Sequence, residues 1–177
     1  MSTLPAAVPF SVRPQTAADL PAIDDLLDKA FGPGRHAKAS YRLREGSAEV
    51  PGLSLVAETP DGGLIGSIRY WPVAAHAADG TETPLLLLGP LVVRPDLQGK
   101  GVGLRLMADT LAEAAKRGHR LVILVGDLSY YARAGFALVP PRQVRMPHPY
   151  DPARLLWREL VPGASDGVCG VLGPAAP

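Results

Sequence analysis

The chain has 177 residues, a formal net charge of +1 and a single cysteine, Cys169. This length suits one α/β domain with a sizeable core, and a composition of 47% hydrophobic and 20% charged residues is typical of a globular protein. The near-neutral charge gives no electrostatic reason to expect nucleic acid or an anionic membrane as a partner, and one cysteine excludes an intrachain disulfide.

The sequence also argues against secretion and membrane insertion. No basic segment followed by an apolar stretch opens the chain, so we expect no secretory signal. The longest apolar run, 85–93, is interrupted by Gly89-Pro90 and is far shorter than the roughly 20 residues of a membrane helix. We therefore expect a cytoplasmic protein. Because the sequence contains no Cys/His cluster of a metal-binding kind, no metal site is predicted.

Hydrophobic periodicity predicts alternating strands and helices within one domain, residues 8–161. The expected strands, in chain order, are 9–13, 53–58, 64–72, 84–93, 121–125, 136–139 and 155–161. The expected helices are 17–31 with Thr16 as its N-cap, 36–45, 102–117 and 128–134. Residues 162–177, which are rich in glycine, proline and alanine, are expected to form a loose, flexible C-terminal tail.

The most informative segment is 91–103, which reads LVVRPDLQGKGVG and leads directly into the helix expected at 102–117. An apolar strand that ends at a proline, followed by three glycines at the start of a helix, is a pattern typical of an anion-binding loop. The spacing excludes a mononucleotide P-loop, because Lys100 is followed by Gly101 and no hydroxyl residue follows it. A dinucleotide fingerprint is excluded as well, since Gly99, Gly101 and Gly103 are spaced by two.

The pattern resembles the acetyl-CoA-binding signature of the GNAT acyltransferase superfamily, Q/R-x-x-G-x-G/A after a strand that ends V-x-P. Gln98, Gly101 and Gly103 fit it, with Val93 and Pro95 upstream. Residues 131–136 fit a second family pattern, Y-x-x-x-G-F. The combination GDLSYYARAGF is similar to a bacterial branch that includes the YhbS-type predicted N-acetyltransferases. The strong resemblance covers 85–140.

This resemblance implies an α/β GNAT-type fold, with a mixed, mostly antiparallel twisted sheet, a splayed central strand and flanking helices. Pro90 would be out of place in a regular central strand, because it has no N–H group. In a GNAT fold that strand carries a bulge and separates from its downstream neighbour, so that its free backbone groups pair with the pantetheine arm of CoA. We expect Gly89-Pro90 to mark this separation.

The resemblance further implies an N-acetyltransferase with acetyl-CoA as co-substrate and the primary amine of a small molecule or protein as acceptor. Tyr131 is the candidate general acid, and the adjacent Tyr130 is the alternative for that role. Asp127 is either a ligand for an amine or water or the N-cap of the next helix. The implied acetyl-CoA-binding residues are Leu91, Val92, Val93, Gln98, Gly99, Lys100, Gly101, Val102 and Gly103.

The acceptor side is expected to involve residues 31–45. This segment carries Arg35, His36, Lys38, Arg42 and Arg44, which form either a solvated helix face or an electropositive rim for the CoA 3′-phosphate or an acidic acceptor.

Several assignments on the acceptor side stay open. The same mouth could also be lined by Arg69 and Trp71, at the end of strand 64–72, with a place in the core as the alternative for Trp71. The possible general bases, none at a decisive spacing, are Glu45, Glu58, His76 and Asp96. The alternative function is a catalytically idle acyl-CoA-binding or regulatory module. The oligomeric state is left open, with a homodimer as one option.

Overall fold

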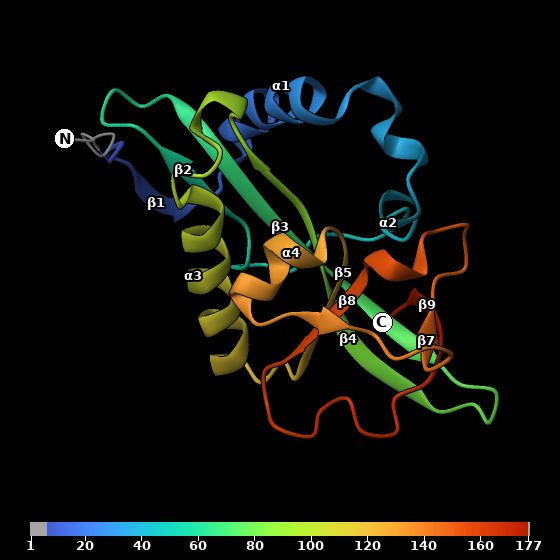
Figure 1. Cartoon of the computed structure of the whole chain (residues 1–177). Helices are drawn as coiled ribbons and strands as arrows, with labels where there is room; N and C mark the ends of the chain where they lie inside the picture. Colours follow the sequence, from blue (N-terminus) through green and yellow to red (C-terminus); the bar gives the residue numbers. More distant parts are fainter. Residues whose placement is uncertain (1–6, 177) are drawn as a thin grey trace.

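In the computed structural model, which describes residues 7–176, one twisted sheet carries helices on both of its faces (Figure 1). The strands are β1 (Ser11–Pro14), β2 (Leu55–Glu58), β3 (Leu64–His76), β4 (Glu82–Val93), β5 (Leu121–Val125), β6 (Ala137–Leu138), β7 (Val144–Arg145), β8 (Leu155–Glu159) and β9 (Gly170–Pro174). The α-helices are α1 (Leu20–Phe31), α2 (Ala39–Arg42), α3 (Val102–Lys116) and α4 (Leu128–Tyr131). Short 3₁₀ turns are η1 (Ala17–Asp19), η2 (Pro33–Ala37), η3 (Pro95–Leu97), η4 (Ala132–Ala134) and η5 (Pro152–Arg154).

The order of the strands confirms the expected mixed, mostly antiparallel sheet. Its main path runs β1-β2-β3-β4-β5-β8-β6, and β9 joins it by pairing with β3. Every neighbouring pair on the main path is antiparallel except β4 and β5, which run parallel. A parallel pair needs a crossover connection, and α3 lies in the connection between these two strands.

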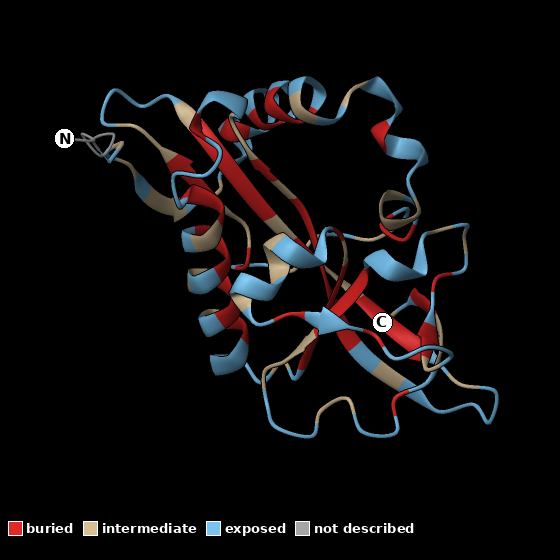
Figure 2. Ribbon diagram, in the orientation of Figure 1, coloured by how far each residue is buried: buried red, intermediate tan, exposed pale blue. Residues whose placement is uncertain are grey.

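The two long helices cover opposite faces of the sheet. Successive residues of a strand point to opposite faces, and in β2 Val56 packs with α1 while Ala57 packs with α3. Ile23 and Leu27 of α1 are almost completely buried, as is Leu106 of α3. Figure 2 shows the buried residues concentrated along β3 and on the side of α3 that faces the sheet.

A bulge in β4 changes which face its side chains occupy. Between two paired positions, Ile68 with Leu91 and Tyr70 with Leu88, β3 advances by two residues and β4 by three. The extra residue lies at Gly89-Pro90, whose peptide bond is cis. As a result Leu88 and Leu91 both pack against the α3-side core, although they are three positions apart, a spacing that places side chains on opposite faces of a regular strand. The bulge expected at Gly89-Pro90 is thereby confirmed.

The expectation of a loose tail is wrong for residues 170–174. These residues form β9, which pairs antiparallel with the second half of β3 and parallel with β7. Val168 and Leu172 are buried against the core beneath this edge. The tail expectation relied on a glycine- and proline-rich composition, but β3 is long enough to hold β2 along its first half and β9 along its second.

Other elements also differ from the expectation. β3 extends to His76 and β4 begins at Glu82, so the connection expected from 76 to 83 is reduced to a hairpin turn at residues 77–81. The helix expected at 36–45 is divided into η2 and the four-residue α2. β7 was not expected at all.

Candidate active site

A cleft of about 810 Å³ opens where β4 separates from β5. The two strands pair only at Leu86 with Val122 and at Leu87 with Ile123. Within residues 7–176, no strand pairs with the β5-facing edge of β4 beyond Leu87. This confirms the expected splayed central strand. It also leaves backbone groups on this edge of 91–93 without a strand partner, so that they can pair with an extended ligand.

The glycine-rich loop lies at one end of this cleft. Gly99 and Gly101 adopt φ angles of +77° and +87°, a region that a residue with a β-carbon rarely occupies. Gly101 is the N-cap of α3, and no side chain caps this end of the helix. The first-turn N–H groups of a 15-residue helix therefore lack intrahelical partners and carry partial positive charge. An anion fits this arrangement.

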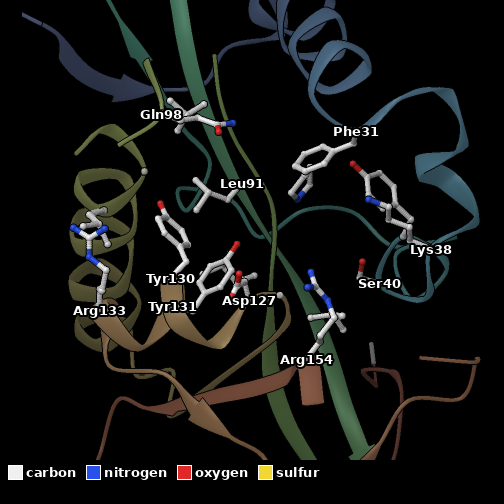
Figure 3. Close-up of a pocket in the computed structure, with 18 of the residues that line it drawn as sticks. Phe31, Lys38, Ser40, Leu91, Gln98, Asp127, Tyr130, Tyr131, Arg133 and Arg154 are labelled. Atoms are coloured by element: carbon white, nitrogen blue, oxygen red, sulfur yellow. The ribbon is translucent and has the colours of Figure 1, made fainter. Parts of the chain in front are cut away.

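The structure brings most of the predicted acetyl-CoA-binding residues to the cleft. Those that line it are Leu91, Val93, Gln98, Gly99, Gly101, Val102 and Gly103. Two do not. The side chain of Val92 is buried on the opposite face, beneath α1, and Lys100 is exposed beside the cleft. Figure 3 shows Leu91 and Gln98 along the wall that leads to the glycine loop.

The two adjacent tyrosines of α4 line the cleft from the opposite side (Figure 3). The Tyr130 hydroxyl lies so close to Cα of Gly103 that a β-carbon there would collide with it. The ring of Tyr131 lies in the same way against Gly126, at the end of β5. The rings meet edge to face, with centroids 5.0 Å apart. The Tyr130 hydroxyl thus lies at the glycine-loop end of the cleft, and Tyr131 lies beside the separation of the strands.

Burial determines the protonation of both phenols. It raises the pKa of Tyr131 well above its ordinary value near 10, and the neighbouring Tyr130 adds to this effect. Burial also raises the pKa of Tyr130, while Arg133 opposes the shift in part. Both hydroxyls consequently keep their protons at neutral pH and can donate a hydrogen bond into the cleft.

Asp127 lines the cleft and also caps α4. Its Oδ1 accepts hydrogen bonds from the backbone N–H of Ser129 at 2.9 Å and from the Ser129 hydroxyl at 2.8 Å. These bonds lower the pKa of Asp127. The N-cap role considered from the sequence is therefore present, and the carboxylate still faces the cleft.

Only part of the predicted basic rim reaches the cleft. Lys38 and Arg44 line it, together with Phe31, Ser40 and Tyr41. Arg35 instead is buried and pairs with Asp28 and, at 3.5 Å, with Asp24. The residues of the predicted mouth that do not line the cleft are Arg35, His36, Arg42, Arg69 and Trp71.

None of the four possible general bases lines the cleft. Glu58 pairs with Arg13, and Asp96 pairs with Arg94. His76 lies at the far end of β3, and Glu45 follows α2 away from the lining.

The sequence analysis missed the wall formed by Pro149, Tyr150, Asp151 and Arg154. Asp151 caps η5 by accepting the N–H of Ala153. The run P-H-P-Y-D-P marks a turn but carries no sequence signal for a site.

Two further features bear on the type of site. Among residues 7–176, no group of three or more His, Cys, Asp or Glu side chains is placed to hold a metal ion. No helix in the described part of the chain is long and apolar enough to cross a membrane.

Comparison with solved structures gives the same architecture. The structure of the GNAT family N-acetyltransferase YhbS from Escherichia coli in complex with CoA has a TM-score of 0.79 and 28% identity, covering 99% of this chain and 94% of that one. A GNAT family acetyltransferase from Brucella melitensis in complex with acetyl-CoA has a TM-score of 0.65 and 27% identity, covering 96% and 97%.

Sequence comparison agrees. The uncharacterized N-acetyltransferase YhbS of Escherichia coli K12 is 29% identical over 161 residues, which are 91% of this chain and 93% of that protein. The uncharacterized N-acetyltransferase YjhQ of the same strain is 32% identical over 128 residues, covering 72% of this chain and 69% of YjhQ. The family described as "Acetyltransferase (GNAT) domain" matches residues 11–139. The chain therefore belongs to the GNAT acetyltransferase family, and it is an acyltransferase.

Proposed function

We propose that this protein transfers an acetyl group from acetyl-CoA to a primary amine, with Tyr131 as the general acid. The observation that carries the proposal is the joining of three features in one cleft: the uncapped N-terminus of α3, the unpaired edge of β4 and the Tyr131 ring. The CoA bound in the similar E. coli structure and the acetyl-CoA bound in the Brucella structure support it.

In the proposed complex, the loop from Gln98 to Gly103 holds the pyrophosphate through main-chain N–H groups, with Lys100 beside a phosphate. The main chain of Leu91, Val92 and Val93 pairs with pantetheine and places one N–H against the thioester oxygen. A preorganised donor of this kind lowers the barrier by about 3 kcal/mol.

The reaction is direct attack by the neutral amine. Its nitrogen forms a bond to the thioester carbon, and the carbonyl oxygen becomes an oxyanion that the β4 backbone stabilises. Collapse breaks the C–S bond and produces the amide and the CoA thiolate. Tyr131 then donates its proton to the sulfur. The amine nitrogen releases one proton to solvent as the amide forms, and the Tyr131 phenolate takes one proton back from solvent, which restores the starting state. Burial favours the neutral form of both the phenol and the leaving thiol.

The direct test is calorimetric titration with acetyl-CoA, followed by free-thiol detection across a panel of amines. Gly101→Val should weaken acetyl-CoA binding about 10- to 100-fold, since its φ of +87° disfavours a β-carbon and the loop that presents charge-binding N–H groups would shift. Gly80→Val is the matched control, because Gly80 has a φ of +89° in a turn outside the cleft. Absence of acetyl-CoA binding by the folded protein would overturn the proposal. Binding without turnover of any amine would favour an idle acyl-CoA-binding module.

A further inference from the structure

The cleft contains a buried guanidinium that the acetyl-transfer mechanism does not use. Arg44 follows α2, is only 9% exposed and lines the cleft. Its guanidinium carbon lies 4.0 Å from the centroid of the Tyr41 ring and 5.6 Å from that of Trp71. These rings fix the side chain in place by cation–π contact, so the charge is held rather than free to extend into solvent.

This guanidinium has no carboxylate partner among the residues that the structure describes. Arg44 takes part in none of the ion pairs, and its Nε lacks a hydrogen-bond partner. The Tyr41 hydroxyl, which belongs to the same cleft lining, is also buried without a partner. Burial lowers the pKa of Arg44 to about 10, so the group stays positive at neutral pH. Buried Arg35, by contrast, has two carboxylates.

An unpaired buried charge is costly, and the usual remedy is a partner of opposite charge. The rest of the cleft favours an anionic partner too. Its lining contains four cationic side chains against two carboxylates, an excess of two positive charges. The cationic residues are Lys38, Arg44, Arg133 and Arg154, and the carboxylates are Asp127 and Asp151.

The position of Arg44 separates it from the phosphate end of the cleft. Its Nη2 lies beside Gly89, where it would be 3.3 Å from an added β-carbon. Gly89 lies in the bulge, two positions before Leu91, whereas the glycine loop follows Val93 in the other direction. Arg44 thus lies at the end where the strands separate, beyond the reach of groups bound at Gly99–Gly103.

We infer that the acceptor is an amine that carries a carboxylate, which Arg44 binds while the nitrogen faces the thioester. This inference rests on the proposed acetyl transfer. The planar guanidinium donates two parallel N–H hydrogen bonds to the two oxygens of a carboxylate, and the Tyr41 hydroxyl supplies a further donor. A guanidinium beside Gly89, only two positions before the proposed pantetheine-binding segment, suits a short amino acid, in which few bonds separate the amine from the carboxylate.

The test compares the common L-amino acids with their carboxamides, each pair differing only in the charged group. We expect kcat/KM to favour the best acid over its amide by about 10- to 100-fold, the usual effect of a hydrogen-bonded charge. Arg44→Gln should abolish that preference by slowing the acid, while the rate with the amide and the affinity for acetyl-CoA change less than about threefold. The matched control, Arg42→Gln, alters an exposed cation of α2 outside the lining and should keep the preference.

Equal rates for acids and amides in the unaltered protein, or an equal loss for both in Arg44→Gln, would overturn the inference. If Arg44→Gln does not fold, the inference is tested by the acid-to-amide ratio of kcat/KM, measured in Arg44→Lys and in the unaltered protein. If acetyl-CoA binds but no acceptor turns over, calorimetry of the same pairs with CoA-loaded protein decides: acid-selective binding supports the inference, and its absence overturns it. Failure to bind acetyl-CoA would instead refute the proposed function. Titration of the same pairs into the free protein would then test whether Arg44 binds a carboxylate.

Discussion

At the scale of single residues, the adjacent tyrosines are distinguished by what each ring contacts. Sequence spacing favours Tyr131 for the catalytic role, but it cannot tell which ring faces the thioester. In the structure the Tyr130 hydroxyl lies against Gly103, near the anion end, and the Tyr131 ring lies against Gly126, at the end of β5. Both glycines are required because a side chain at either position would occupy the space of a ring.

The corresponding prediction concerns Tyr131→Phe. We expect turnover to fall about 10- to 1000-fold, the range for loss of a proton donor, with little change in acetyl-CoA affinity. Single-turnover kinetics and calorimetry measure the two effects separately. Tyr130→Phe is the matched control, because it removes the neighbouring hydroxyl and keeps the ring. A loss of that size in Tyr130→Phe alone would transfer the role to Tyr130. Because the pKa of Tyr131 is raised, its deprotonation should not reduce kcat below about pH 10.

The basic rim shows the limit of prediction at this scale. Five basic residues lie within ten positions, and hydrophobic periodicity cannot tell which of them reaches the cleft. That depends on partner residues in other elements of the fold. Arg35 is neutralised by two carboxylates of α1, and Arg44 reaches the cleft because Tyr41 and Trp71 flank it. Trp71 lies 27 positions away in sequence, a relation that one sequence does not reveal.

At the scale of elements, the link between β1 and α1 depends on one buried carboxylate. Asp19 accepts hydrogen bonds from Arg13 Nη1 at 2.8 Å and Nη2 at 2.9 Å. It also accepts the backbone N–H of Thr16 at 2.7 Å, which completes the helix cap. These donors, Arg13 first, lower the pKa of Asp19 well below its usual range. The predicted cap at Thr16 is therefore present, but Asp19 supplies the acceptor.

We predict that Asp19→Asn lowers the free energy of unfolding by about 2 kcal/mol at pH 7, the effect of losing hydrogen bonds to a charged group. Because the folded pKa is depressed, this contribution is complete above about pH 4 and is lost as the pH falls below it. Urea unfolding at several pH values should show the difference from the unaltered chain shrinking in acid. Asp25→Asn, on an exposed ion pair with Lys29, should change stability by less than about 1 kcal/mol. A difference that stays constant down to strongly acidic pH would contradict the assignment.

Elements with strong periodicity or a long apolar run were predicted well. The helix expected at 102–117 is α3, and the strand expected at 121–125 is β5. β7 and β9 were missed because their two and five residues carry no alternation of their own. β9 pairs with β3, which is distant in sequence, and β7 pairs with β9. A glycine-rich composition, moreover, favours a loop when only local sequence is considered.

At the scale of the whole molecule, the C-terminal residues complete the sheet. We predict that a chain ending after Gly167 loses at least about 3 kcal/mol of stability, because it lacks the buried Val168 and Leu172 and leaves one edge of the second half of β3 without a partner strand. Urea unfolding measures the loss. A chain ending after Pro174 is the control and should be close to the full chain. Equal stability of both truncated chains would mean that β9 contributes little.

The short contact between β4 and β5 also affects the stability of the folded protein. Two residue pairs join these strands, so the part of the sheet built on β5 and β8 is connected to the rest by few interstrand hydrogen bonds. An acetyl-CoA molecule bound between β4 and β5 would contact both strands and stabilise the folded state. Its concentration would then enter the unfolding equilibrium, adding about 2.7 kcal/mol at one hundred times the dissociation constant. Resistance to urea and to added protease should therefore rise with the concentration of acetyl-CoA.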